Sequence, residues 1–158
     1  MKRMARLLIV GCCLSALLFS CVRTDENAYL GQKTPGMTPE VFAPGILSKA
    51  GFHLHSCLAF SPDGNEIYFT KMVFEPERQG TICVMRRVDG RWTGPDTASF
   101  SGEYSDDSPA FSPDGMRLYF SSTRPEAEED ETGDLNFWVV ERAEKGWSEP
   151  APAESVLN

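Results

Sequence analysis

The chain has 158 residues, 41% of them hydrophobic and 24% charged, and its formal net charge is −8 at pH 7. Its 15 basic residues are outnumbered by 23 acidic ones. Such a surface repels phosphate backbones, so nucleic acid is excluded as a partner.

Residues 1–20 are typical of a bacterial lipoprotein signal peptide. A basic patch precedes residues 7–19, an almost wholly apolar run that is too short to span a bilayer. The run ends in Leu18-Phe19-Ser20-Cys21, which resembles a lipobox, so Cys21 is the predicted lipidation site and mature N-terminus. Val22 follows it in place of an acidic residue, and resemblance to sorted lipoproteins then favours the outer membrane. Ordinary cleavage, lipidation at Cys12 and an uncleaved anchor are the alternatives.

Residues 21–42 are predicted to be a tether between the lipid and the folded part of the chain. They are mostly polar and contain Pro and Gly, a composition that favours an extended linker. Loss of residues 1–20 would remove three basic residues and no acidic ones, which makes the mature chain more acidic still.

The rest of the chain contains an internal repeat. Ser61-Pro62-Asp63-Gly64 recurs as Ser112-Pro113-Asp114-Gly115, 51 residues later, and Ile67-Tyr68-Phe69 recurs as Leu118-Tyr119-Phe120. Beyond an insertion of four residues, Trp92 corresponds to Trp147. A fixed period of this size indicates a repeat architecture.

Each unit predicts four strands, and we expect an all-β domain. The expected strands are residues 57–60, 66–71, 81–87 and one around Trp92, and then residues 108–111, 117–122, 136–142 and one around Trp147. In each Ser-Pro-Asp-Gly segment, Pro presets φ and Gly takes the left-handed position that closes a hairpin.

Cys57 falls on a first strand and Cys83 on a third strand of the same unit. A whole strand would separate them, which places their Cα atoms beyond the reach of a disulfide. We expect two buried, reduced thiols.

Residues 59–70 and 110–122, with Arg124, resemble the WD40-like repeats of TolB-type β-propellers. The resemblance covers residues 43–158 and implies four-stranded antiparallel blades at 44–94 and 95–149, with a third that begins at Pro150. Because propellers close with about 4–8 blades, this is an incomplete propeller. The chain looks like the truncated front end of a longer propeller, and completion by self-association is the alternative.

The same resemblance implies that residues leading into each first strand lie near the central channel, where propellers bind ligands. The candidate binding residues are His53, His55, Glu103, Tyr104, Asp106 and Asp107. The alternative is that these side chains cap strand ends and bond to the backbone.

Two sets of residues suggest metal binding, and neither pattern supports it. His53, His55 and Cys57 alternate on one strand, but in the repeat they align with Tyr104, Asp106 and Ser108, which are not a ligand set. The acidic run at residues 126–134 lacks the ligand spacing of a calcium loop and is expected to be solvated. We predict no metal site.

The sequence contains no Gly-x-Ser-x-Gly, no His-Glu-x-x-His and no phosphate-binding glycine loop, so we expect neither an enzyme nor a cofactor. Trp92 and Trp147 repeat at equivalent points and are expected to be scaffold, not sugar-stacking residues. The leading hypothesis is a non-enzymatic, lipid-anchored module of the outer membrane or periplasm that binds protein or peptide partners. The alternatives are the gating propeller of a serine peptidase and a propeller that binds or hydrolyses carbohydrate.

Overall fold

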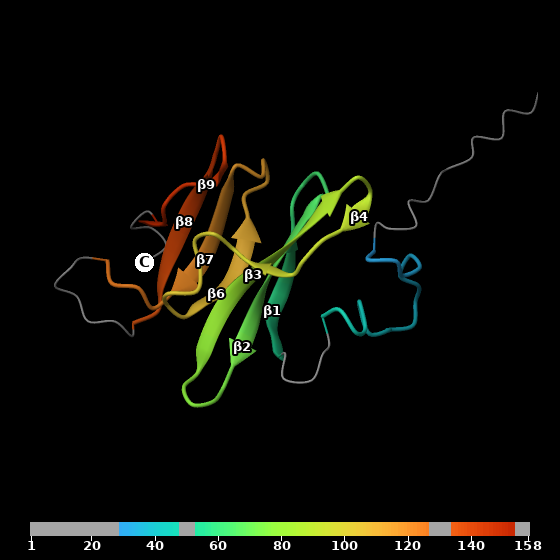
Figure 1. Ribbon diagram of the computed structural model, residues 1–158, viewed down its shortest axis with the longest axis horizontal. Helices are drawn as coiled ribbons and strands as arrows, with labels where there is room; N and C mark the ends of the chain where they lie inside the picture. Colours follow the sequence, from blue (N-terminus) through green and yellow to red (C-terminus); the bar gives the residue numbers. More distant parts are fainter. Residues whose placement is uncertain (1–28, 48–52, 127–133, 154–158) are drawn as a thin grey trace, which may run out of the picture.

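The computed structural model describes residues 29–47, 53–126 and 134–153. All regular elements in these ranges are β-strands, and they form two antiparallel sheets that lie side by side in Figure 1. The all-β expectation is confirmed. The same ranges contain no helix that is long and apolar enough to cross a membrane. The predicted signal peptide and Cys21 lie outside the described residues.

Each sheet has five strands. The first contains β1 (His53–Phe60), β2 (Glu66–Val73), β3 (Gln79–Val88), β4 (Arg91–Trp92) and β5 (Asp96–Thr97), in the order β1-β2-β3-β4 with β5 also paired to β3. The second contains β6 (Asp106–Phe111), β7 (Arg117–Ser122), β8 (Asn136–Ala143), β9 (Gly146–Trp147) and β10 (Ala151–Pro152), in the order β10-β8-β7-β6 with β9 also paired to β8.

The two Ser-Pro-Asp-Gly segments form the same hairpin turn, as predicted. The Gly64 N–H donates to the Ser61 carbonyl at 2.9 Å, and the Gly115 N–H donates to the Ser112 carbonyl at 2.9 Å. The two glycines have φ values of 70° and 72°, in the left-handed region that a Cβ disfavours. The turn is therefore determined locally, by residues within one hairpin.

The sheets extend past the prolines that were expected to separate the units. β5 follows Pro95 and pairs with β3 of the first sheet, and β10 follows Pro150 and pairs with β8 of the second. Because proline has no N–H for the ladder, it divides the outermost strand of each sheet into two short pieces. Residues 96–97 and 151–152 thus complete their own sheets, and the described residues contain no strand of a third unit.

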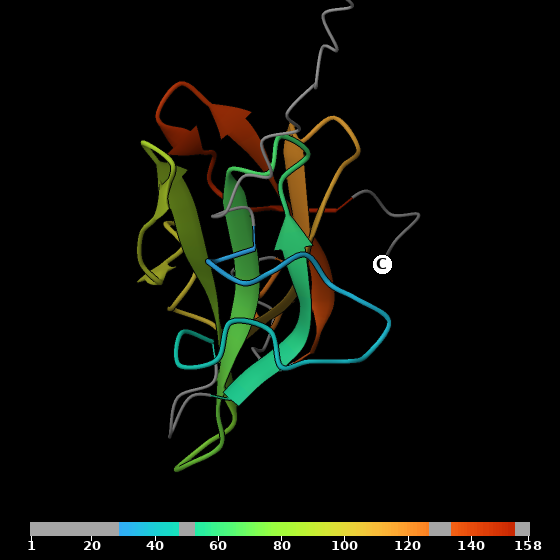
Figure 2. The same cartoon turned by 90° about the vertical axis from the view of Figure 1, so that its right-hand side faces the viewer.

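Part of the expected tether is packed onto the first sheet. Leu30 and Phe42 are partly buried against a cluster in which Ala43 and Leu47, from the start of the predicted domain, meet Ile67, Phe69, Cys83 and Met85. The Gln32 side chain donates to the Val41 carbonyl at 2.8 Å and accepts from the Ala43 N–H at 2.5 Å. Figure 2 shows this segment, in blue, crossing the outer side of the sheet. Leu30 and Phe42 therefore hold the two ends of this part of the predicted tether against the sheet, while most residues between them are exposed.

The core lies between the two sheets. Tyr68, Ile82 and Val84 of the first sheet pack with residues of the second, among them Leu118, Phe120, Trp138, Val140 and Trp147. The Trp147 indole N–H donates to the Tyr68 hydroxyl at 2.8 Å, so the polar atoms of both rings are paired although both rings are buried. Trp147 therefore acts as scaffold, as expected from its repeated position.

The sheets approach each other so closely at Gly80 that a Cβ there would overlap the Asp106 carbonyl. The Gly80 N–H donates to the Ser105 hydroxyl at 2.9 Å, a bond from the first sheet to the segment that leads into the second. Glycine at this position allows the second sheet to pack against β3.

Both cysteines described by the structure are free thiols, but the expected burial is wrong for Cys57, which lies on an edge strand of the sheet. Cys57 is exposed, whereas Cys83 is buried under residues 29–47. Burial raises the pKa of the Cys83 thiol.

Candidate functional site

Two of the predicted binding residues, His55 and Asp107, lie close together near the starts of β1 and β6. His55 Nδ1 lies 2.9 Å from Asp107 Oδ2, and the two side chains are 41% and 15% exposed. One belongs to the first sheet and the other to the second. Contact between residues so far apart in the sequence shows that tertiary packing assembles this cluster.

A difference in register explains why these two residues meet. His55 pairs with Thr70 on the neighbouring strand, and Asp107 pairs with Ser121, which is the repeat equivalent of Thr70. His55 is therefore the structural counterpart of Asp107, and the sequence alignment of His55 with Asp106 is wrong. The cause is a β-bulge in each sheet, which holds one more residue in β1 than in β6.

Both bulges contain a serine in a left-handed conformation. Ser56 has φ 62° and Ser108 has φ 56°, values that are uncommon for residues other than glycine. The hydroxyl of the fully buried Thr70 accepts from the Ser108 N–H at 3.1 Å and lies 3.4 Å from the Ser56 hydroxyl. These bonds tie the two bulges together beside His55.

The bulge also separates His55 from Cys57, because the left-handed Ser56 interrupts the alternation of side chains. The expected shared face of His53, His55 and Cys57 is not formed. Within residues 29–47, 53–126 and 134–153, no three His, Cys, Asp or Glu side chains are grouped so that they could hold a metal ion.

Asp106 lies in the interior and not at the surface as expected. It is 0% exposed and binds Arg124 at 2.8 Å through one carboxylate oxygen, and its other oxygen accepts from the Ser101 hydroxyl at 2.7 Å. The Arg124 guanidinium also lies over the rings of Tyr104, Phe120 and Trp138, at 5.5, 5.1 and 5.2 Å from their centroids. Asp106 therefore supports the fold through a buried ion pair with Arg124, and the Tyr104 ring packs against the cation.

The structural importance of Arg124 was not predicted from the sequence, where the residue entered only through the family resemblance. Arg124 lies two residues after β7, and Asp106 is the first residue of β6, the strand that pairs with β7. The ion pair between Arg124 and Asp106 spans 18 residues. Sequence patterning alone does not identify it.

The remaining candidates lie on the surface. Glu103 is exposed between β5 and β6, and the exposed His53 ring contacts the Phe74 ring edge-on, with centroids 5.3 Å apart. The apolar side chains of Leu54, Val73 and Phe74 at this end are 39%, 40% and 50% exposed. Successive side chains of a strand alternate in direction, so Leu54 and Val73 project to the other face of the sheet from His53 and His55. We call the set formed by His53, His55, Phe74 and Asp107 the strand-start surface. It lies toward the hairpin between β2 and β3 (Figure 1).

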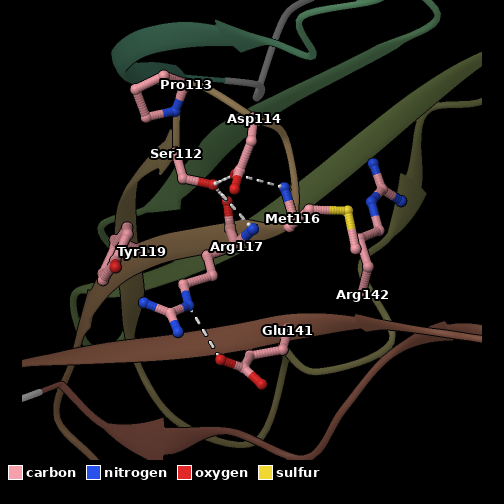
Figure 3. Close-up of a pocket in the computed structure, with 8 residues that line it drawn as sticks. All are labelled: Ser112, Pro113, Asp114, Met116, Arg117, Tyr119, Glu141 and Arg142. Carbon is pink, nitrogen blue, oxygen red and sulfur yellow. Dashed lines mark hydrogen bonds and ion pairs between the residues drawn. The ribbon is translucent and has the colours of Figure 1, made fainter.

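A second candidate site lies at the opposite end of the sheets, beside the Ser112–Asp114 turn (Figure 3). This hollow has a volume of about 570 Å³ and is lined by Ser112, Pro113, Asp114, Met116, Arg117, Tyr119, Glu141 and Arg142. Arg117 Nε and Glu141 Oε1 are 2.9 Å apart, and the two side chains are 51% and 60% exposed. Hydrogen bonding to Tyr119 and Glu141 raises the pKa of Arg117. The hollow therefore presents the exposed Arg117–Glu141 ion pair to solvent.

The turn aspartates are held in their ionised form. Hydrogen bonds from the Ser61 hydroxyl and from Asn65 lower the pKa of Asp63 to about 2. The Ser112 hydroxyl and the Met116 N–H lower the pKa of Asp114 in the same way. Carboxylates of this kind are poor proton donors at neutral pH, so neither turn supplies a general acid.

The first unit contains the equivalent hollow, of about 450 Å³, but there the second unit forms one wall. Arg142 of the second sheet forms an ion pair with Glu66 of the first. Gly115 lies against the Pro62 ring, where an added Cβ would be 3.0 Å from Pro62 Cδ. The two hollows thus arise from the same repeat. The hollow of the first unit has the second unit as a wall, whereas the residues that line the hollow of the second unit all belong to that unit.

A scan against protein-family models found no match for this chain, and a search of curated proteins found none either.

Proposed function

We propose that this chain is a non-enzymatic binding module of the cell envelope, which binds a protein or peptide partner through the strand-start surface. In this proposal the two sheets are blades of a TolB-like β-propeller. Lipid on Cys21 holds the module at the outer membrane, facing the periplasm.

The blade assignment is supported by the equivalence of the two sheets. Each has four successive antiparallel strand positions, the same hairpin turn and a fourth strand divided by proline. They pack face to face around a shared apolar core, as repeated radial sheets do in propellers.

The choice of a binding function rests on the composition of the strand-start surface. The half-exposed Phe74 ring contacts the His53 ring, and the His55 imidazole on the same face of β1 meets the Asp107 carboxylate of the other sheet. Exposed apolar side chains with polar groups at their margin are typical of protein-binding surfaces. The hydroxyls of Ser56 and Thr70 near His55 bond to each other and to the backbone, which favours recognition over hydroxyl activation by His55.

The proposal is tested by cross-linking in intact cells, with the full-length tagged chain and its Phe74→Ala and His55→Ala variants. Val88→Ala is the matched control, because Val88 is 53% exposed and lies at the other end of β3. We expect a specific protein adduct with the wild type and the control, reduced at least about tenfold by Phe74→Ala, as for a hot-spot aromatic residue that contributes over about 1.4 kcal/mol. An adduct of equal yield in all variants would contradict the proposal, and so would the absence of any adduct.

The anchor is tested separately with radiolabelled palmitate. We expect the label in the wild-type chain and its loss in Cys21→Ala. Label that persists in this variant would contradict lipidation at Cys21.

A further inference from the structure

The outer face of the second sheet carries apolar side chains that no part of the described structure covers completely. Along β8, Trp138 and Val140 pack against the first sheet, so Phe137 and Val139 project to the other side. Tyr119 on β7 pairs with Val139 and shares this side. Phe137 is 48% exposed, and the neighbouring Leu135 is 61% exposed. We call Tyr119, Phe137 and Val139, together with Arg117 and Glu141, the open face.

The equivalent face of the first sheet is fully buried. Tyr68 pairs with Val84 as Tyr119 pairs with Val139, and these two residues are 0% and 1% exposed because the second sheet covers them. The backbone repeats as well, since the Ala98 N–H donates to the Ile82 carbonyl at 2.9 Å and the Ala153 N–H to the Phe137 carbonyl at 2.9 Å. The open face therefore repeats one side of an interface that exists inside the molecule, whose other side is formed by Leu118, Phe120 and Trp138.

The charged hollow follows the same pattern. In the first unit, Arg142 of the second sheet enters the hollow and binds Glu66. In the second unit, the Arg117–Glu141 pair lines the hollow without such a neighbour among its lining residues (Figure 3). The open face thus combines apolar area with one cation and one anion that can reach across to a partner.

The other end of the pair of sheets is closed. The outer face of the first sheet, with Ile67, Phe69 and Met85, is covered by Ala43 and Leu47. A second copy could stack head to tail on the open face only if residues 29–47 left this position. The surface that a second copy offers without such a rearrangement is its own open face.

We propose that two copies of this chain associate through their open faces, related by a two-fold axis. In such an isologous contact, the same residues of both copies face one another, so Arg117 of one copy can bind Glu141 of the other. Tyr119, Phe137 and Val139 of both copies form the apolar centre. The strand-start surface takes no part, so this inference is independent of the proposed function.

Sedimentation velocity of the full chain in non-ionic detergent, from about 1 to 100 μM, tests the association. We expect a concentration-dependent dimer for the wild type and at least about a tenfold weaker dimer for Phe137→Glu. Val88→Glu is the control, because Val88 is similarly exposed but lies on the first sheet. Tryptophan fluorescence shows that each variant is folded. A wild-type monomer throughout this range overturns the proposal, and so does a dimer that Phe137→Glu and Val88→Glu weaken equally.

A charge exchange tests the two-fold geometry. Arg117→Glu places two anions on the open face, and Glu141→Arg places two cations there, so each variant alone is expected to be monomeric. Mixed together, the two variants should form a heterodimer, because every cross-copy pair then joins opposite charges. This outcome does not follow from the Arg117–Glu141 pair within one chain. A mixture that stays monomeric while the wild type dimerises overturns the two-fold arrangement.

Discussion

The two sheets are built from the same repeat, yet their equivalent residues have different surroundings. Tyr68 is fully buried and accepts a hydrogen bond from Trp147, whereas Tyr119 lies half-buried on the open face. Asp106 is fully buried beside Arg124, whereas Leu54, which occupies the same position in the register of the first sheet, is 39% exposed. Local structure is therefore repeated, and burial is decided by the neighbour that each sheet has.

The largest expected effect is at the buried ion pair. Asp106→Ala leaves the Arg124 guanidinium buried without its carboxylate, and should lower the free energy of unfolding by about 3–5 kcal/mol. Leu54→Ala, the counterpart in the first sheet, should cost less than about 1 kcal/mol, because a half-exposed side chain contributes little. Urea unfolding followed by tryptophan fluorescence measures both. Equal losses in the two variants would show that the sheets do not differ at this position.

A smaller effect is expected at Tyr68 and Tyr119, which occupy equivalent positions in the two sheets. Tyr68→Phe removes the acceptor of the buried Trp147 N–H and should cost about 1–3 kcal/mol, the penalty for an unpaired buried donor. Tyr119→Phe in the second sheet should change the unfolding free energy by less than about 0.5 kcal/mol, as expected for a surface position. The comparison fails if Tyr119→Phe is the more destabilising of the two in urea unfolding at low protein concentration.

The smallest effect concerns pH and the first hairpin turn. The pKa of Asp63 in the folded chain is about 2, below the unfolded value of about 3.9. Its contribution to stability is therefore present above about pH 4 and is lost as the pH falls through the folded pKa. Asp63→Asn should lower stability slightly at pH 7 and have no effect near pH 2, and solvent screening keeps the difference small.

Ser61→Ala sharpens this prediction, because the Ser61 hydroxyl is the main cause of the lowered pKa of Asp63. With Asp63 still present, this variant should reduce the change in unfolding free energy between pH 7 and pH 3. Urea unfolding at several pH values measures it. A pH dependence identical to that of the wild type in both variants would contradict the role assigned to the turn.

Much of the site could not be predicted because it depends on contacts between sheets. His55 and Asp107 lie next to each other at the surface, whereas Asp106, also predicted to be a binding residue, is buried. One additional residue in the first bulge shifts the alignment there, and no sequence pattern shows which residue a bulge holds. The contacts of Leu30 and Phe42 with the first sheet were not predicted, because a few apolar side chains in a polar segment have no periodicity.

The long strands, the two hairpin turns and the placement of Cys57 and Cys83 on strands that are not neighbours could be predicted from the residues alone. Each of these follows from short-range chemistry: proline and glycine restrict the backbone, and aromatic and β-branched residues favour strands. Which of two repeat-equivalent residues is buried depends on the packing of the sheets in the tertiary structure. Burial depends on the element that covers a face of the sheet, and two similar repeats give no indication of which faces are covered.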